Sequence, residues 1–295
     1  MAGDLKHVVV AGGSGLVGRH LAAALRGMGA RVTVLSRAAG PGTRSWDDLP
    51  EALAGADAVI NLCGAGIADR RWSAPRKRVL LDSRVGPTER LVRAMGGSGV
   101  LVNASAVGIY GALGDQPADE AQAPGQGFLA ELCQRWEAAA DVAAAQGVRV
   151  VKLRLGVVLA RDGGALAKMA LPVRLFLGTP LGHGRQGLSW IHVEDLVRLV
   201  IEAAANPAYA GPVNAVAPWP VSNEDFTRAL AMRLKRPILP VPAWVTRMAL
   251  GALLGEMGET MLLEGAYVIP RQAERLGFAF RFARLEDALA DLLPA

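Results

Sequence analysis

The sequence has little cysteine. Only Cys63 and Cys133 occur in 295 residues, too few for the disulfide framework that holds small secreted proteins together. We therefore expect a reducing, cytoplasmic setting. The composition, 52% hydrophobic and 20% charged, is far from that of a disordered chain, and a chain of this length buries a large core.

Long hydrophobic runs are also missing. The run His7–Ala11 is too short for the core of a signal peptide and leads directly into a glycine-rich loop. The apolar stretch Ala243–Gly255 is interrupted by Arg247 and falls short of the roughly 20 residues that a membrane helix needs. We interpret this stretch as a buried or interface helix and expect no membrane partner.

The positive charge does not gather in one place. The net charge is +5, but the arginines are scattered, with local clusters only at Arg70-Arg71 and at residues 76–78. A nucleic-acid-binding protein needs a basic patch or stripe, so we expect no nucleic-acid partner. The four histidines lie far apart and neither cysteine lies near another ligand type, so we expect no metal site.

Short apolar runs alternate with helix-length segments over the first 160 residues. Each run is apolar on both faces, which is typical of parallel strands covered on both sides. Repeated units of this kind predict an α/β fold with a Rossmann-type doubly wound parallel sheet. The expected strands are His7–Ala11, Arg31–Ser36, Ala58–Leu62, Val100–Ala104, Val148–Leu155 and Pro212–Val216, and the expected helices are Leu16–Arg26, Pro75–Met95 and Phe128–Ala145.

The second half of the chain has a different character. Residues 161–189 are rich in glycine and proline and are expected to form loops. From Pro218 onward, segments bounded by proline indicate a smaller α+β region, with a helix at Ser222–Leu234, a short strand at Ile238–Val241 and two or three further helices. We expect residues 1–165 to form the Rossmann domain, with 188–216 returning to it. Residues 166–187 and 217–295 would form the smaller domain that covers the substrate.

A glycine-rich turn links the first strand to the first helix. Gly13, Gly15 and Gly18 fit the pattern G-x-G-x-x-G, and Gly12 precedes them. In a strand–turn–helix unit, such glycines make the tight turn, let the backbone approach a pyrophosphate and let helix and strand pack closely. The helix N-terminus then faces the anion. This position therefore predicts a dinucleotide-binding site.

The end of the second strand indicates which dinucleotide binds. An NAD site normally has an acidic residue about 20 residues after the glycine turn, bonded to the ribose 2′-hydroxyl. Here the segment ends in Ser36 and Arg37, and no acid follows until Asp47. A guanidinium suits a 2′-phosphate, so we predict NADP(H). The alternative is that Arg37 is a solvated charge at a strand end.

These motifs together resemble the extended short-chain dehydrogenase/reductases. More narrowly, they resemble an atypical epimerase-like branch that is related to sugar-nucleotide epimerases and has a C-terminal domain of unknown function. The resemblance spans nearly the whole chain. It is carried by the glycine turn and by Asp57–Gly64, Arg71-Trp72, Asp82–Arg84, Ser105–Gly108, Trp136-Glu137, Gly184–Gln186, Trp190–Asp195, Pro212–Pro218, Val268–Pro270 and Gly277-Phe278.

The resemblance implies roles for particular residues toward NADP(H), and it implies that Asp57 is structural. Arg84 stands near the position where many extended members have Asn. The implied cofactor residues are Gly12, Gly13, Ser14, Gly15, Leu16 and Val17 for the pyrophosphate, Ser36 and Arg37 for the adenosine phosphate, Leu62, Cys63 and Gly64 for the adenine and ribose side, Arg84, and Val158 for the nicotinamide half.

The chain lacks the acid–base pair of the family it resembles. Extended members use Tyr-x-x-x-Lys, in which the lysine lowers the pKa of the tyrosine. None of Tyr110, Tyr209 and Tyr267 is followed by lysine four residues later. Counting back from Glu137 places Leu129 at the tyrosine position and Cys133 at the lysine position. The companion serine is uncertain as well, because an ungapped reading puts Ala106 there and Ser105 one position before it.

Two explanations for the missing pair stay open. In the first, other groups replace it and the protein is an oxidoreductase or nucleotide-sugar epimerase-like enzyme. The candidate groups are Ser105, Tyr110, Glu131, Cys133 and His192, of which we assign Ser105 and Tyr110 as catalytic. In the second, the protein binds NADP(H) without catalysis and acts as a sensor or regulator.

Two loops are the expected walls of a substrate site, Ala65–Trp72 and Gly182–Ser189. Arg70, Arg71 and Arg185 lie in them and supply hydrogen-bond donors, as does Gln186. Such donors suit a small anionic, carbonyl or sugar-like ligand. Charged groups on surface loops would also explain them. Whether the protein is a homodimer is left open.

Overall fold

A seven-stranded parallel sheet forms the centre of the computed structural model, which describes residues 5–36, 40, 42–97 and 99–294. Two strands that are adjacent in the sheet, β1 and β4, lead to opposite halves of it, which is the topological switch point of a doubly wound sheet. The predicted Rossmann-type fold is confirmed. The strands, in spatial order, are β11 (Gly211–Ala215), β7 (Arg149–Leu155), β5 (Val100–Ala106), β4 (Ala58–Asn61), β1 (His7–Ala11), β2 (Arg31–Ser36) and β3 (Thr43–Ser45).

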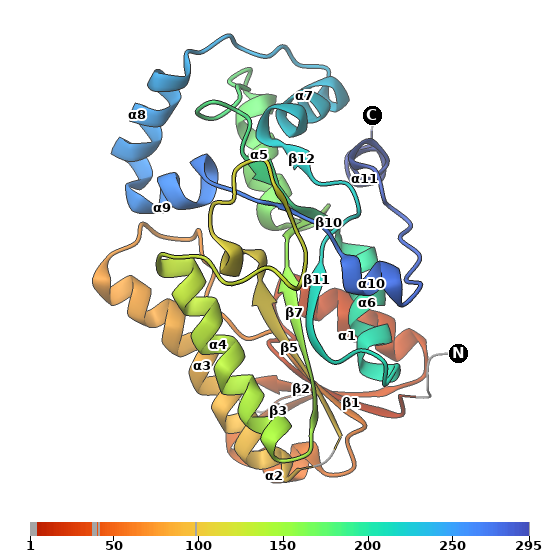
Figure 1. The fold of residues 1–295 in the computed structure, drawn as a ribbon. Helices are drawn as coiled ribbons and strands as arrows, with labels where there is room; N and C mark the ends of the chain where they lie inside the picture. The colour runs from red at the N-terminus through yellow and green to blue at the C-terminus, as the bar shows by residue number, and fades with distance from the viewer. Residues whose placement is uncertain (1–4, 37–39, 41, 98, 295) are drawn as a thin grey trace.

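Helices cover both faces of this sheet (Figure 1). Side chains alternate along a strand, so Val8 and Val10 join one core while Val9 and Ala11 join the other. Because both faces of a strand are buried, its amino-acid sequence is a continuous apolar run. The helices α1 (Leu16–Gly27) and α6 (Val193–Ala205) pack on the first face, and α2 (Leu49–Leu53), α3 (Ala74–Met95) and α4 (Phe128–Ala145) on the second.

A second core lies beyond the carboxyl ends of the strands. It is built around Trp190 and Phe226, both fully buried. Around it lie β8 (Val157–Ala160), parallel to β10 (Trp190–His192), and β9 (Gly187–Leu188), antiparallel to β12 (Val221–Ser222), together with α5 (Gly164–Arg174), α7 (Asn223–Leu234) and α11 (Leu285–Leu292).

The remaining elements complete the described part of the chain. β6 (Pro117–Ala118) pairs with β13 (Tyr267–Val268). The others are the 3-10 turns η1 (Trp46–Asp48) and η2 (Val107–Tyr110), the helices α8 (Ala243–Leu254), α9 (Glu256–Gly258) and α10 (Arg271–Arg275), and a π-helical turn, η3 (Glu259–Leu263). The division of the chain into two domains at residue 165 stays a prediction, although β11 does return to the main sheet.

Two local expectations were wrong. Residues 164–174, expected as loop, form α5, because Leu166, Ala170 and Val173 recur at helical spacing and are buried in the second core. The expected strand Ile238–Val241 is irregular backbone. Prolines flank and interrupt it, and a proline cannot donate a hydrogen bond to a strand ladder.

The apolar helix α8 is not buried. Of its residues only Thr246 is buried, while Trp244, Met248 and Leu253 are exposed, so this part of the expectation was wrong. No helix among the described residues has the length and apolarity to cross a membrane. In Figure 1, α8 and α9 stand at the outer edge of the upper part of the molecule.

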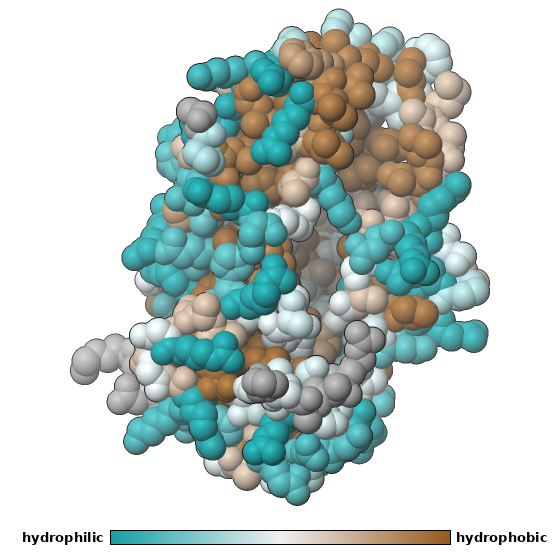
Figure 2. All heavy atoms as spheres, turned by 180° about the vertical axis from the view of Figure 1, so that it is seen from behind, coloured by the Kyte–Doolittle hydropathy of each residue, from teal (hydrophilic) through white to brown (hydrophobic). Residues whose placement is uncertain are grey.

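The carboxyl ends of the seven parallel strands share one edge of the sheet. The glycine turn, the loop after β4 and the turn η2 all follow strands at this edge. Figure 2 shows a hollow at mid-height, between an upper part where hydrophobic residues gather and a more hydrophilic lower part. In doubly wound sheets, ligands bind outside the carboxyl ends of the strands at the switch point, so this edge is where we look for the site.

Candidate functional site

Three of the four glycines in the turn after β1 are required by the packing of the protein itself. Gly12 has φ +80°, and a Cβ on it would lie 2.7 Å from the carbonyl carbon of Leu62. A Cβ on Gly13 would lie 2.6 Å from Val34 Cγ1, and one on Gly18 would lie 2.4 Å from the carbonyl oxygen of Gly12. These contacts hold the turn tightly against β2 and the end of β4, and the start of α1 tightly against the turn.

Gly15 is different, because packing requires its lack of a side chain much less strictly. A Cβ there would lie 3.3 Å from the Gly12 carbonyl oxygen, a tight contact that a shift of a few tenths of an ångström would relieve, and its φ is an ordinary −71°. Gly15 is the N-cap of α1, whose first turn has neither a capping side chain nor an acidic residue. The N-terminus of α1 therefore offers unpaired N–H groups and an unblocked approach, which is what a pyrophosphate requires.

The segment Leu62–Gly64 follows β4 and lies beside the glycine turn. A buried amide network shapes it: Asn61 Nδ2 donates to Asn103 Oδ1 at 2.7 Å, and the Cys63 N–H donates to Asn61 Oδ1 at 3.1 Å. Burial raises the pKa of Cys63 to about 12, so this thiol stays neutral. Gly64 lies against Arg84, whose Cζ is 3.0 Å from the position of a Cβ on Gly64.

The two ends of the predicted cofactor site are described to different degrees. Ser36 is the half-buried last residue of β2, whereas Arg37 lies outside the described residues. At the other end, Val158 pairs in register with Ile191. A Cβ on Gly164, at the start of α5, would lie 2.7 Å from Leu16 Cδ2 and 3.9 Å from the Val158 carbonyl oxygen. The β8–α5 connection therefore lies next to the first residue of α1.

The predicted catalytic residues Ser105 and Tyr110 belong to one buried hydrogen-bond network. Ser105 Oγ donates to Glu137 Oε1 at 2.7 Å, and Tyr110 Oη donates to Asn214 Oδ1 at 2.6 Å. Arg154 joins the two halves: its Nε and Nη2 donate to the Glu137 carboxylate at 2.9 and 3.0 Å, and its Nη1 donates to Tyr110 Oη at 2.9 Å. All five residues are buried.

In this network the hydroxyl groups of Ser105 and Tyr110 are both hydrogen-bonded within the protein. Burial raises the pKa of Tyr110, an effect that the Arg154 guanidinium partly offsets, so the phenol is neutral at neutral pH. The assignment of Ser105 and Tyr110 as catalytic stays a prediction. Sequence reasoning missed Glu137, Arg154 and Asn214 as functional candidates. A signal was present, because an arginine that lies between two leucines of a strand, as Arg154 does in β7, is expected to have a buried partner.

The positions of the absent tyrosine and lysine are filled by apolar packing. The Leu129 side chain packs against Gly108, with its Cβ 3.3 Å from the position of a Cβ on that glycine. Cys133 is buried, and its pKa is raised to about 11 by burial and by the nearby Glu137. Neither residue supplies a group that ionises near neutral pH.

The two other candidates lie in different settings, one on a helix and one at the end of a strand. Glu131 is exposed on α4. His192 caps α6 by accepting the Glu194 N–H at 3.1 Å, and its ring stacks on Phe282 with 3.8 Å between ring centroids. Burial lowers the pKa of His192. These contacts give His192 a structural role.

The first predicted substrate wall is attached to the C-terminal part of the chain. Asp69 Oδ1 lies 3.2 Å from Lys168 Nζ on α5. Arg71 Nη2 lies 3.1 Å from the position of a Cβ on Gly255, just after α8. Both Arg70 and Arg71 are exposed. The loop 65–72 thus extends from the main sheet to the second core.

Gln186 fixes the second predicted substrate wall, the loop 182–189, and one of its two polar side-chain atoms has no partner among the described residues. Its Nε2 donates to the carbonyl oxygens of Leu181 at 3.0 Å and Leu262, in the π-helical turn, at 2.7 Å. Its Oε1 is buried and has no hydrogen-bond partner among the described residues. A buried acceptor of this kind is costly unless a ligand or water completes it. Arg185, its neighbour, is exposed.

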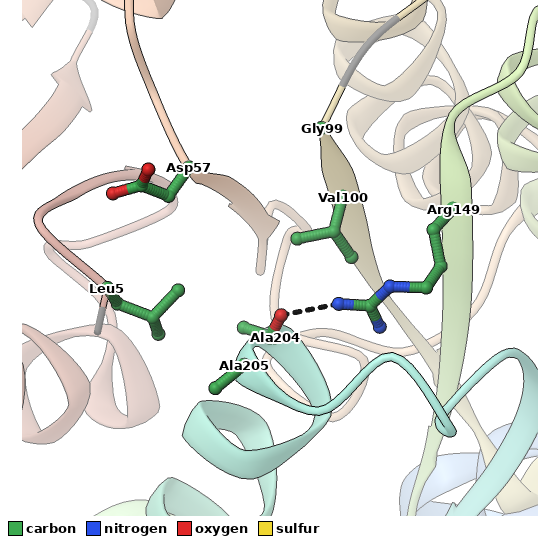
Figure 3. Close-up of a pocket in the computed structure, with 7 residues that line it drawn as sticks. All are labelled: Leu5, Asp57, Gly99, Val100, Arg149, Ala204 and Ala205. Atoms are coloured by element: carbon green, nitrogen blue, oxygen red, sulfur yellow. Dashed lines mark hydrogen bonds between the residues drawn. The ribbon is translucent and has the colours of Figure 1, made fainter. Parts of the chain in front are cut away.

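A separate pocket of about 260 Å³ lies at the opposite, amino-terminal end of the strands (Figure 3). Asp57 Oδ2 accepts the N–H groups of Lys6 and His7 at 2.7 and 2.8 Å, in agreement with its expected structural role. Arg149 donates to the carbonyl oxygens of Ala203 and Ala204. The polar groups of this pocket hold the backbone together, so we do not place the functional site there.

Comparison with known proteins agrees with this geometry. Residues 8–216 match the model of the NAD dependent epimerase/dehydratase family, and residues 241–292 match a domain of unknown function, DUF1731. An epimerase family protein of Mycobacterium bovis is 44% identical over 293 residues, which cover 96% of each chain.

Two solved structures extend the comparison. The human epimerase family protein SDR39U1, crystallised with NADPH, is 35% identical with a TM-score of 0.88, over 98% of this chain and 99% of that one. A nucleoside-diphosphate sugar epimerase of Corynebacterium glutamicum is 34% identical with a TM-score of 0.81, over 98% of this chain and 58% of that one. The match over residues 8–216 and these full-length similarities show that the chain belongs to the NAD dependent epimerase/dehydratase family, among the extended short-chain dehydrogenase/reductases that carry the DUF1731 domain.

Proposed function

We propose that this protein binds NADP(H) along the carboxyl edge of its sheet. The observation that carries the proposal is Gly15, the one turn glycine whose missing side chain leaves room for a ligand rather than for the protein. The residues Gly12–Val17 would hold the pyrophosphate, and Ser36 and Arg37 the 2′-phosphate. The NADPH in the crystal structure of human SDR39U1, which is similar over its full length, supports this choice of dinucleotide.

The remaining cofactor residues would lie along the same edge. Leu62, Cys63 and Gly64 would line the adenine and ribose side, and Arg84 would lie beside them. Val158 would face the nicotinamide half, because β8 is packed next to the start of α1. The bound cofactor would supply or accept a hydride at its nicotinamide ring.

We further propose that the protein is an oxidoreductase or epimerase-like enzyme for a small carbonyl or sugar-like substrate. The substrate would lie between the loops 65–72 and 182–189. The free acceptor Gln186 Oε1 would take a hydroxyl hydrogen of such a substrate, and the exposed Arg70, Arg71 and Arg185 would supply donors at the rim.

In this proposal, Ser105 donates a hydrogen bond to the substrate oxygen at the place where the tyrosine acts in the family that the sequence resembles, and solvent would supply the proton. Its hydroxyl hydrogen points at Glu137 and would turn toward the substrate by rotation about the Cβ–Oγ bond. The Glu137 carboxylate would keep its two charge-assisted hydrogen bonds from Arg154, so it would not be left unpaired. Tyr110 would keep Arg154 in place from the other side.

A second function, binding of NADP(H) without catalysis, is favoured by one observation. Every proton-bearing candidate near β5 is already satisfied within the protein: Ser105 by Glu137, and Tyr110 by Asn214. A site built only to hold a dinucleotide needs no free acid. The protein would then act as a sensor or regulator.

Titration and turnover measurements separate these functions. The purified protein is titrated with NADPH, NADP⁺, NADH and NAD⁺, and NADPH oxidation is then followed against a panel of carbonyl and sugar compounds. Turnover that is lost in Ser105→Ala supports the enzyme, and Tyr110→Phe should lower it. Tight NADPH binding without turnover on any compound supports the sensor. Failure to bind any of the four dinucleotides would contradict both.

A further inference from the structure

Two arginines of α3 point to the same loop and have no acidic partner. Arg84 donates from Nη1 to the Leu80 carbonyl oxygen at 2.9 Å and from Nη2 to that of Ala65 at 3.1 Å. Arg76 donates from Nη2 to the Gly66 carbonyl oxygen at 2.5 Å. Among the described residues, no carboxylate oxygen forms an ion pair with either guanidinium.

Both charges are partly removed from water. Arg76 and Arg84 are half-buried. Burial lowers the pKa of Arg84, and the charge of Arg76 lowers it further. The Arg76 Nε is buried and has no hydrogen-bond acceptor among the described residues. Backbone carbonyls supply hydrogen bonds but no countercharge, so two like charges are held together at a cost.

Two acidic residues near the arginines are paired with other cations. A third, Asp82 on α3, is exposed and forms no ion pair with either arginine among the described residues. Asp69, the only acid between residues 64 and 76, is paired with Lys168 at 3.2 Å. Glu137, which lies near Cys133 on the other side of Arg84, is held by Arg154 at 2.9 Å. The positive charge of the arginine pair is therefore left for something outside the protein.

The pair lies inside the proposed site. The Arg84 guanidinium is 3.0 Å from the position of a Cβ on Gly64, and Leu62, two residues earlier, contacts Gly12 of the glycine turn. On its other side, Arg84 lies over the Trp136 ring, with 5.3 Å between Cζ and the ring centroid. Arg84 thus stands between the glycine turn and the part of α4 that faces β5.

We propose that Arg76 and Arg84 form a subsite for an oxyanion, a carboxylate or phosphate group of the ligand that enters this site. Guanidinium groups recognise such groups through paired, charge-assisted hydrogen bonds. The inference rests on the proposed function and adds a substrate class to it: an anionic carbonyl or sugar derivative. A phosphate of the dinucleotide itself is the other source of the same chemistry.

The test uses charge-neutral and charge-keeping variants of the full chain. Arg84→Gln and Arg76→Gln keep an N–H donor for the loop carbonyls but remove the charge, and Arg84→Lys keeps the charge but loses the paired donors. Arg93→Gln is the matched control, because Arg93 is exposed on the same helix and lies 3.8 Å from Glu89. Circular dichroism and thermal unfolding check that each variant folds.

Each protein, free and saturated with NADPH, is titrated with inorganic phosphate and with malonate at constant ionic strength. NADPH fluorescence and the melting temperature report binding. If the substrate supplies the oxyanion, the NADPH-loaded wild type and Arg93→Gln bind the anions. Arg84→Gln and Arg76→Gln then bind them at least about tenfold more weakly, as expected for lost charge-assisted hydrogen bonds. Arg84→Lys falls between. The NADPH affinity of Arg76→Gln changes less than about threefold, and Arg76 decides between the two sources because Arg84 is itself among the proposed cofactor residues.

If the dinucleotide supplies the oxyanion, the outcome differs. NADPH binds at least about tenfold more weakly to Arg84→Gln and Arg76→Gln, and the anions bind only the free protein. The proposal is overturned if neither anion nor NADPH binding changes relative to Arg93→Gln. A wild type that does not bind NADPH at all contradicts the proposed function instead, and the titration of the free protein with phosphate still tests the arginine pair.

Discussion

The glycines of the turn after β1 have different structural roles. Gly12, Gly13 and Gly18 allow the protein to pack on itself, whereas the Cβ position of Gly15 is open apart from one contact at 3.3 Å. The G-x-G-x-x-G pattern alone does not distinguish these uses, because it records only where side chains are missing. What each missing side chain makes room for is a property of the surrounding structure.

Substitution of single glycines should separate folding from binding. Gly15→Ala should change the free energy of unfolding by less than about 1 kcal/mol, because its φ is ordinary and its Cβ would need a shift of only a few tenths of an ångström from the Gly12 carbonyl oxygen. NADPH affinity should nevertheless fall at least about tenfold, since the methyl group would stand in the path of the pyrophosphate. Urea unfolding and NADPH titration measure the two effects.

Gly18→Ala is the matched variant. Its Cβ would lie 2.4 Å from the Gly12 carbonyl oxygen, so it should lower the free energy of unfolding by about 1–3 kcal/mol. Equal losses of stability in the two variants would show that Gly15 is a packing glycine and would remove the main support for the cofactor site.

Arg37 should decide the preference for NADPH over NADH. The prediction comes from the sequence, since Arg37 follows β2 outside the described residues. Arg37→Asp should weaken NADPH binding about tenfold to a hundredfold, the usual range for lost charge-assisted hydrogen bonds, and leave NADH binding unchanged. Parallel titrations with the two dinucleotides measure this. Unchanged NADPH affinity would make Arg37 a solvated strand-end charge.

The hydrogen-bond network between Ser105 and Asn214 unites five elements. Ser105 lies on β5, Tyr110 in η2, Glu137 on α4, Arg154 on β7 and Asn214 on β11. The helix α4, on which the resemblance places the positions of the Tyr-x-x-x-Lys pair, contributes a buried carboxylate to an ion pair with Arg154. Its change of role is visible only when the strands that face it are in place.

Breaking this ion pair should be costly for the whole fold. Glu137→Gln leaves the buried Arg154 guanidinium without a countercharge, and removing one partner of a buried pair costs about 3–5 kcal/mol. Glu131→Gln, an exposed change on the same helix, should cost less than about 0.5 kcal/mol. Urea unfolding compares the two variants. A small loss in Glu137→Gln would mean that the pair is dispensable for folding.

Contacts between the main sheet and the C-terminal part shape the site as a whole. Lys77 Nζ lies 2.6 Å from Glu256 Oε1 on α9, and Lys168 Nζ lies 3.2 Å from Asp69 Oδ1. These partly exposed ion pairs add little stability. They nevertheless hold the loop 65–72 and the start of α3 against α5 and α9, so that residues from both parts would line the proposed site.

NADPH should stabilise the entire molecule. A ligand at 100 times its Kd adds about 2.7 kcal/mol to the free energy of unfolding, which corresponds to a rise of roughly 5–10 °C in Tm for a chain of this size. NADH at the same concentration should raise Tm less, because it lacks the 2′-phosphate. Differential scanning fluorimetry with both dinucleotides tests this. An equal rise with NADH would contradict the predicted preference for NADP(H).

Local patterns in the sequence were sufficient for six of the seven parallel strands of the main sheet, all but β3, for the helix Phe128–Ala145 and for the glycine turn, because each depends on residues that are close together along the chain. They failed for α5, whose apolar face is recognisable only against the second core. The tertiary structure alone decided the partners of the buried polar groups. Tyr110 and Asn214 are 104 residues apart and share a hydrogen bond, and nothing in either local sequence specifies the other. Hydrogen bonds and charges select partners by position in space, and that position exists only after the hydrophobic layers have packed.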